Sequence, residues 1–213
     1  MKLDYTLDNL ESHDEKLSLQ LWVAVSVLRK LKSTFGECVF LAGGAPRNWY
    51  EEKLANDLDF YIDSSFGTYT KSKLLEAFSE VSSEGTLETL LDKAEDTSNN
   101  YEGSALNIRH IWSYKIKGVV VQFIFVTPPQ RMDEAQFQDY ILNSFDVDIC
   151  RIGIDHNSDF IKKECFLKDL IEDKTLTVRI KDLSPYQLKR CLSVHVPKLQ
   201  KYYPEHELKF VAN

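Results

Sequence analysis

Two aspartates, Asp57 and Asp59, alternate with large apolar residues in the segment DLDFYI, residues 57–62. Side chains two apart on a β-strand lie on one face, about 7 Å from each other along the backbone. Buried carboxylates so placed repel each other unless a cation lies between them. Mg²⁺ takes such oxygen ligands and joins one or two carboxylates to substrate phosphates. The pair predicts a site for Mg²⁺ or Mn²⁺; the alternative is an edge strand whose polar face meets solvent.

A glycine pair, Gly43-Gly44, ends a short apolar run, and twelve residues separate it from Asp57. Glycine has no side chain, so backbone N–H groups there can approach a phosphate closely, and a helix start favours negative charge. Arg47 follows, either as a phosphate clamp through its planar fork or as a surface ion pair to Glu51 one turn on. Alone, the glycines would also fit a tight turn. With the aspartates, they predict a bound nucleoside triphosphate.

These residues need a framework that brings turn and aspartates together, and the apolar patterning supplies one. On the second strand we expect Asp57, Asp59 and Tyr61 on one face. Helices are expected at 13–35, 45–54, 70–81 and 132–145, strands at 38–42, 57–62, 105–116, 118–126 and 146–155, and a helical turn with a polar, acidic loop within 85–103.

The last part of the chain, from about residue 160, is expected to be mainly helical, with one short strand at 176–180. Ser184 and Pro185 mark a helix start, and Pro197 should end or kink that helix near His195. Without repeats, low-complexity tracts or Gly/Ser linkers, residues 1–213 are interpreted as one domain with a basic helical C-terminal segment. The fold class expected is α+β, a mixed sheet flanked by helices.

Charge is distributed unevenly along the chain. The net charge is −7, but from Lys174 onward eight Lys and Arg face three Asp and Glu, against 18 and 30 in residues 1–173. General nucleic-acid binding by the acidic body is thereby disfavoured. The basic residues near Tyr202 and Tyr203 fit either a single-strand contact or an amphipathic helix with lysines facing water.

Cysteine spacing and hydropathy exclude other classes of protein. No C-x-x-C pair occurs, which disfavours zinc binding and a disulfide framework. No apolar run approaches the roughly 20 residues that span a bilayer, and no secretory signal is recognisable, so we expect a cytoplasmic protein without a membrane partner. The cytoplasm would be the host's if the protein is viral. The four cysteines are expected to be free thiols, at positions Cys38, Cys150, Cys165 and Cys191.

The segment 42–60 resembles the signature of the DNA polymerase β-like nucleotidyltransferase superfamily: an apolar residue, two glycines, a spacer, then Asp, apolar, Asp, apolar. GGAPRN, residues 43–48, looks most like the GGxxRD loop of the CCA-adding and poly(A) polymerase branch, with Asn48 in place of Asp. The resemblance implies a polymerase β-like fold with Mg²⁺ held by Asp57 and Asp59. It also implies transfer of a nucleoside monophosphate from an NTP with loss of pyrophosphate.

The family also uses a third carboxylate on a neighbouring strand. In the CCA-adding branch this residue lies on a later apolar strand, where the present sequence has Gln122. The remaining candidates are Asp146 and Asp148, of which Asp146 is favoured because short phage-type proteins that look similar also carry Phe-Asp here. Either would activate the acceptor hydroxyl. Two hypotheses remain: a nucleotidyltransferase acting on an RNA or tRNA end or a protein, or a catalytically degenerate nucleotide-binding or protein-binding module, such as a regulator or viral counter-defence factor.

Overall fold

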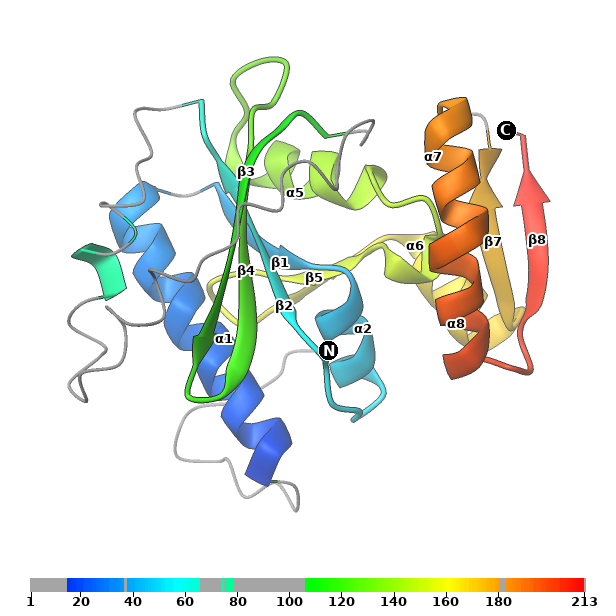
Figure 1. The fold of residues 1–213 in the computed structure, drawn as a ribbon, viewed down its shortest axis with the longest axis horizontal. Coiled ribbons are helices and arrows are strands. Elements are labelled where there is room, and N and C mark those ends of the chain that lie inside the picture. The colour runs from blue at the N-terminus through cyan, green and yellow to red at the C-terminus, as the bar shows by residue number, and fades with distance from the viewer. Residues whose placement is uncertain are drawn as a thin grey trace.

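The computed structural model describes residues 15–36, 38–65, 74, 76–78, 106–180 and 183–212. Figure 1 shows a central sheet with helices packed around it and a smaller unit of helices and strands beside it. The main elements are α1 (Glu15–Phe35), β1 (Val39–Ala42), α2 (Gly44–Tyr50), β2 (Leu58–Asp63), β3 (Ile108–Ile116), β4 (Val119–Val126), α5 (Glu134–Asn143), β5 (Ile152–Ile154), β6 (Phe160–Lys162), α6 (Glu164–Leu167), β7 (Thr175–Arg179), α7 (Pro185–Arg190), α8 (Val196–Tyr202) and β8 (Glu207–Val211).

The six-stranded sheet is mixed and has the order β3-β4-β2-β1-β5-β6. β2 and β4 run parallel, and every other neighbouring pair is antiparallel. β3 and β4 form a hairpin whose turn residues, Lys117 and Gly118, both have positive φ, the combination that a tight two-residue turn requires. A mixed sheet flanked by helices confirms the fold class predicted from the sequence.

The sheet is buried on both faces, and β2 shows how. Leu58, Phe60 and Ile62 belong to a core that includes the buried side of α1, whereas Tyr61 belongs to a second core against α5. Phe60 also stacks on Phe123 of β4, with ring centroids 5.8 Å apart. The predicted alternation is therefore confirmed from Leu58 to Ile62, whereas Asp57 lies before the strand. Burial of both faces specifies the register of the strand.

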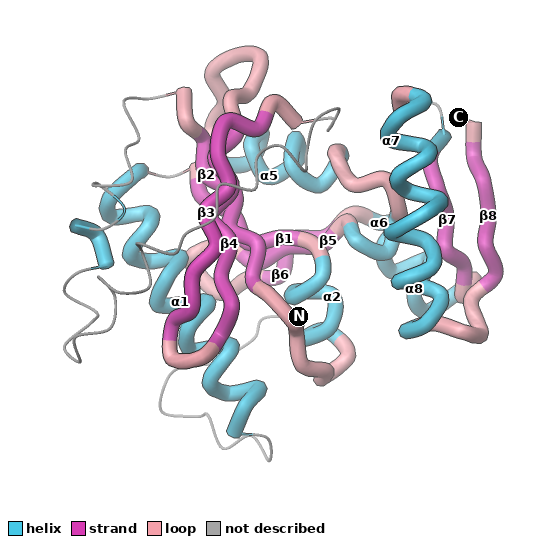
Figure 2. The backbone as a smooth tube through the Cα atoms, in the orientation of Figure 1, coloured by secondary structure: helices cyan, strands magenta, loops and turns pink. Residues whose placement is uncertain are grey.

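The smaller unit contains a two-stranded parallel sheet, β7 and β8, covered by a long helical run, as Figure 2 shows. The run passes from α7 through a π-helical turn, Cys191–His195, into α8. Of the two outcomes predicted for Pro197, a helix end near His195 is wrong, because the backbone stays helical to Tyr202. The regular α-helix is nevertheless interrupted by the π turn directly before the segment that contains Pro197. Strands β6 and β8 were not predicted, because β6 has three residues and β8 five, which leaves little periodic signal.

The expected strand at 146–155 is also wrong in its first half. Asp148–Cys150 forms a 3-10 turn, and only Ile152–Ile154 pairs as β5. Val147 makes a single bridge to Val178 of β7, which turns the backbone toward the smaller unit. Asp146 and Asp148 consequently do not share one strand face.

Several other expectations concern segments or properties away from the sheet. The expected helix at 70–81 falls mostly, and the segment 85–103 entirely, outside the described residues. The four cysteines are free thiols, as predicted. No helix within the described ranges is long and apolar enough to cross a lipid bilayer.

Candidate nucleotide and metal site

The antiparallel pairing of β1 with β2 brings the glycine turn to the end of the sheet where the aspartates lie. Leu41 pairs with Phe60, so continuing the register by one residue sets Ala42 level with Asp59. The N–H of Gly43 donates to the carbonyl of Ile152 at 2.9 Å, which ties the turn to β5 as well. Backbone pairing alone therefore places the two halves of the sequence motif side by side.

The two glycines have different surroundings. Gly43 has φ of +92°, and a Cβ there would lie 3.1 Å from the ring of Phe145, so both conformation and space require glycine. Gly44 begins α2, and a Cβ at this position would meet only Nη2 of Arg47, at 3.9 Å. Gly43 thus shapes the turn, whereas Gly44 keeps the backbone open beside a guanidinium.

Asp59 carries a buried carboxylate oxygen, Oδ1, that has no hydrogen-bond partner. Burial first, and then the charge of Asp57, raise the pKa of Asp59 to about 7, while Lys198 acts in the opposite direction. Asp57 comes directly before β2 and is partly exposed. A desolvated, unsatisfied oxygen next to a second carboxylate is an arrangement that a divalent cation would complete, so the donor set fits Mg²⁺.

Gln122 lies level with Asp59 on the parallel neighbour β4. Its other neighbour across the sheet, Ser113 on β3, is also neutral. The position at which the resemblance leads us to look for a third carboxylate is thus occupied by an amide directly beside the aspartate. An amide oxygen can ligate a cation weakly, but it cannot take up a proton at neutral pH.

Arg47 is only 4% exposed and turns inward from α2. Its Nε and Nη2 donate to the side-chain oxygen of Asn48, and Nη1 lies 3.4 Å from the sulfur of Cys150. The guanidinium also lies over the ring of Tyr203, 5.7 Å from its centroid. Glu51, the alternative partner considered from the sequence, pairs instead with Lys53. Arg47 is therefore a fixed interior cation next to the glycine turn.

The carboxylate of Asp148 forms ion pairs with two arginines. Arg179 of β7 donates to both of its carboxylate oxygens, at 2.7 and 2.8 Å, and Arg151 lies 3.1 Å away. The carboxylate is almost completely buried in this arrangement. Two arginines neutralise it, so this aspartate joins the smaller unit to the sheet.

Asp146 faces the helical run of the smaller unit. Its Oδ2 lies 2.6 Å from Nδ1 of His195. Burial works to raise the pKa of Asp146, but the hydrogen bond and charge of His195, together with a hydrogen bond from Cys191, lower it below its ordinary value. Asp146 is thereby kept ionised and is oriented toward a histidine that the sequence did not single out.

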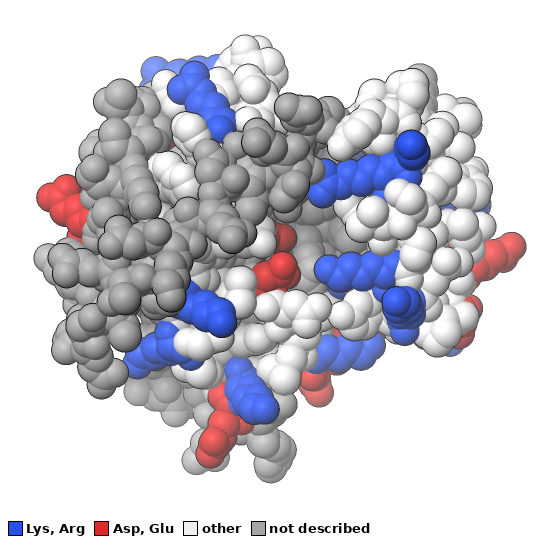
Figure 3. Space-filling model, in the orientation of Figure 1, with Lys and Arg blue, Asp and Glu red and all other residues white. Residues whose placement is uncertain are grey.

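Helix α8 borders the aspartate end of β2. Tyr202 accepts a hydrogen bond from Asn56 at 3.1 Å, and Tyr203 donates to Glu51. Figure 3 shows Lys and Arg side chains over the α7–α8 unit directed toward acidic side chains near the middle of the same face. The basic residues of these helices are Lys189, Arg190, Lys198 and Lys201.

Solved structures with a similar arrangement are tRNA-processing proteins. The chain aligns with a tRNA-processing enzyme in an apo form at TM-score 0.54 and 16% identity, covering 93% of this chain and 45% of that one. A CCA-adding enzyme with ATP gives 0.56 and 14%, covering 92% and 41%. The Thermotoga maritima CCA-adding enzyme complexed with tRNA gives 0.54 and 13%, covering 93% and 40%.

The alignments extend over nearly all of this chain, including the sheet and the smaller unit. The fold is nucleotidyltransferase-like. The chain spans less than half the length of each of these three proteins. No protein-family model matches the sequence, and no curated protein matches it. Structure, not sequence similarity, therefore carries the assignment of the nucleotidyltransferase-like fold.

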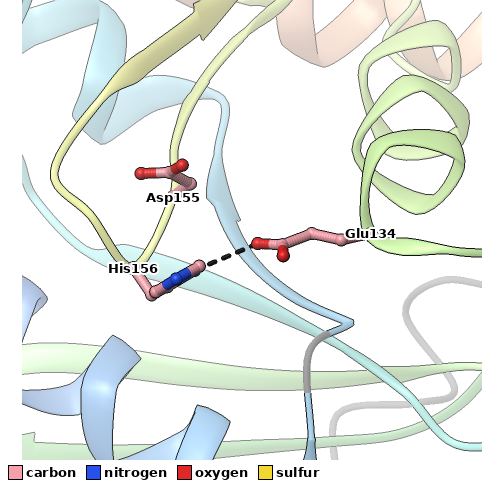
Figure 4. A group of neighbouring side chains, drawn as sticks. All are labelled: Glu134, Asp155 and His156. Atoms are coloured by element: carbon pink, nitrogen blue, oxygen red, sulfur yellow. Dashed lines mark ion pairs between the residues drawn. The ribbon is translucent and has the colours of Figure 1, made fainter.

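A second group of possible ligands lies away from the aspartates of this nucleotidyltransferase-like fold. Glu134, Asp155 and His156 bring one ligand atom each to within 4.8 Å of the others, and His156 pairs with Glu134 at 3.0 Å, as Figure 4 shows. The ammonium of Lys32 lies 2.6 Å from Nε2 of His156. This lysine supplies the positive charge that a metal ion would bring, so the group forms an ion-pair network between α1, α5 and the turn after β5.

The sequence analysis linked none of three residues of the last helices to the aspartates: His195, Lys198 and Tyr203. They lie about 140 residues from the aspartates along the chain, and no motif or spacing links the two regions. Their amphipathic helix pattern predicted the helix but not what its polar side faces. Only the packing of α8 beside the loop before β2 reveals the connection.

Proposed function

We propose that the chain transfers a nucleoside monophosphate from an NTP to a hydroxyl acceptor, with release of pyrophosphate and dependence on Mg²⁺ or Mn²⁺. The unsatisfied Oδ1 of Asp59, beside Asp57 at the glycine turn, carries the proposal. The nucleotidyltransferase-like fold supports it, since similar structures include CCA-adding enzymes with ATP and with tRNA. We infer an RNA or tRNA end, or a protein, as the acceptor.

Each residue of the site has a role in the proposed reaction that follows from its chemistry. Asp57 and Asp59 would hold the cation, which supplies positive charge to neutralise the phosphates. The backbone at Gly44 would lie against the triphosphate, and the fixed guanidinium of Arg47 would contact it. Gly43 would keep the turn in shape. Asp148 has no role in this scheme beyond holding the smaller unit in place, because Arg179 and Arg151 occupy it.

A second candidate function is binding of a nucleotide or a protein without turnover. Gln122 favours it, because it lies level with Asp59 where a third carboxylate would stand. In this case the aspartates and glycine turn would still bind NTP and metal. The two functions therefore agree on binding and differ only in turnover.

Thermal unfolding and label transfer separate these functions. We expect each productive NTP to raise the melting temperature only when Mg²⁺ is present, because a ligand that binds only the folded state stabilises it by mass action. Asp57→Asn and Asp59→Asn should abolish this rise, whereas Asp139→Asn, an exposed carboxylate on α5, should retain it. NTPs labelled at the α-phosphate, incubated with total RNA and protein extract, should then label one fraction.

The outcomes lead to distinct conclusions. Mg²⁺-dependent stabilisation with label transfer that Asp59→Asn abolishes supports the transferase. Stabilisation without any transfer or pyrophosphate release supports the binding module. If no NTP changes the melting temperature with Mg²⁺ or Mn²⁺, the transferase and the nucleotide-binding module are both rejected, and only the protein-binding module remains.

A further inference from the structure

Among the described residues, no carboxylate on a neighbouring strand is free to take a proton beside Asp59. β4 presents Gln122 at that level, and Asp148 is held by Arg179 and Arg151. A transferred nucleotide nevertheless requires that the attacking hydroxyl lose its proton. Some other group with a lone pair at neutral pH must receive it.

His195 has the geometry of such a group. Its Nδ1 lies 2.6 Å from Oδ2 of Asp146, and because an ionised carboxylate can only accept, Nδ1 carries the proton. The neutral ring then has its lone pair on Nε2. The carbonyl of Asp146 accepts from the N–H of Arg179 at 3.2 Å, which fixes the aspartate from the other side. The His195 side chain remains 39% exposed, so the ring is held at one nitrogen and accessible.

Its position relative to the metal pair follows from the helix that carries it. Lys198 lies three residues further on the same helical run, so the two side chains share a face. The charge of Lys198 lowers the pKa of Asp59 and also that of Cys150. Cys150 in turn contacts Arg47, and the charge of Asp146 raises its pKa. Helix α8 also hydrogen-bonds to Asn56 and Glu51 in the segment before β2, so the helical run that carries His195 borders the site that contains Asp59.

The backbone at this point is unusual in a way that agrees with a local role. His195 ends a π-helical turn in the middle of an otherwise α-helical run. Such turns are rare and occur frequently at functional sites, since the extra residue re-aims the side chains around it. Here the turn aims Cys191 and His195 together at Asp146.

We propose that His195 is the general base for the acceptor hydroxyl and that Asp146 orients it, an inference that rests on the proposed nucleotidyl transfer. The hydroxyl proton passes to Nε2 as the hydroxyl oxygen forms a bond to the α-phosphorus. The bond from the α-phosphorus to its bridging oxygen breaks, and pyrophosphate leaves with the electron pair. Asp146 stabilises the imidazolium that results. The other titratable or charged groups around the pair are Cys150, Cys191, Arg47, Arg179 and Lys198.

The first test uses His195→Asn, which places an amide N–H near the position of Nδ1 and removes the base. We expect the rate of label transfer from an α-labelled NTP into the extract fraction to fall by about 100-fold or more. The rise in melting temperature with NTP and Mg²⁺ should remain. The matched control is His110→Gln, an exposed histidine on β3, which should keep the wild-type rate.

The second test separates a base from a structural anchor. Rates are recorded against pH at saturating Mg²⁺, which keeps Asp59 ionised, so that an ascending limb between about pH 5 and 8 reports an imidazole. His195→Ala should lose this limb, and added imidazole should restore part of the rate. Asp146→Asn should lower the rate with the NTP-dependent melting shift intact.

Failure of this inference differs from failure of the proposed function. If the wild-type protein transfers label and His195→Asn does so within about threefold, with its pH profile unchanged, the base assignment is overturned and nucleotidyl transfer stands. If His195→Asn also loses NTP-dependent stabilisation, and imidazole restores nothing to His195→Ala, the pair is a structural anchor. A wild-type protein without transfer overturns both.

Discussion

Asp59 is the residue at which burial and charge conflict most directly. Its carboxyl binds a proton more tightly in the folded chain, where its pKa is about 7, than at its ordinary value of 3.8. Its contribution to folding is therefore full below about pH 4 and is lost as the pH rises through 7. A difference of this size corresponds to about 4 kcal/mol. Without metal, ionisation of the buried Asp59 carboxyl therefore lowers the stability of the protein at neutral pH.

This conflict gives a prediction for the metal-free protein. Between pH 5 and pH 8, the free energy of unfolding of Asp59→Asn should rise relative to the wild type by about 2 to 3 kcal/mol. Urea denaturation at the two pH values measures it. Asp139→Asn should show no such pH-dependent gain. Mg²⁺ should remove the difference by stabilising only the wild type, and equal curves at both pH values would contradict a raised pKa.

At the scale of elements, the glycine turn combines two separable requirements. Gly43 must be glycine for the backbone, since its φ is +92° and Phe145 lies against it. Gly44 is a helix residue with space beside it, so any need for glycine there comes from a ligand. Two adjacent identical residues therefore serve different purposes.

Alanine substitutions test this division. Gly43→Ala should destabilise the fold by about 1 to 3 kcal/mol, the usual cost of holding a residue with a side chain in a sparsely populated backbone conformation. Gly44→Ala should leave stability equal or slightly higher, because alanine favours a helix by about 1 kcal/mol. It should nevertheless reduce the NTP-dependent rise in melting temperature. Unaltered NTP binding by Gly44→Ala would remove this glycine from the proposed site.

Most elements of the sheet follow from the sequence, because burial on alternate positions is a local signal. α1 has helical periodicity, and β1 to β4 are apolar or alternating runs bounded by turn residues, so their types and approximate limits were predictable. The segment 146–155 has the same alternation, yet its first half turns because Arg179 and Arg151 capture Asp148. Those partners come from β7 and the next turn. Contacts between segments so far apart in the sequence do not change the local spacing of polar and apolar residues, so that spacing cannot predict them.

The same limit applies to the candidate site. Asp57, Asp59 and the glycines could be proposed from spacing because one hairpin-like pair of strands carries them all. Arg47 could be named but not placed, since its contacts with Cys150 and Tyr203 come from later segments. The role proposed for His195 depends wholly on the three-dimensional position of Asp146.

At the scale of the whole molecule, the ion pair between Asp148 and Arg179 connects the sheet to the smaller unit. Both carboxylate oxygens accept from the arginine, and the aspartate is 2% exposed. Removing one member of a buried ion pair costs about 3 to 5 kcal/mol, and when Arg179 is removed Arg151 still compensates part of the charge of Asp148. The relative position of the two units should depend on this contact.

We therefore expect Arg179→Met to lower the free energy of unfolding by about 3 kcal/mol. The double variant Asp148→Asn/Arg179→Met should recover part of this loss, because it removes the charge of Asp148 and leaves only that of Arg151 buried. Urea denaturation of the three proteins provides the comparison. Label transfer by the double variant should persist. Its complete loss in a folded, NTP-binding protein would show that Asp148 takes part in the reaction.

The contacts of α8 with the loop before β2 determine when the site becomes complete during synthesis. Glu51 and Asn56 leave the ribosome long before Tyr202 and Tyr203, which hydrogen-bond to them. Until then the acidic pair has no basic neighbour from the C-terminal helix. Closing so long a loop is slow compared with forming local hairpins. A nascent chain would thus form the strands that carry the glycine turn and the aspartates before α8 can pack beside them.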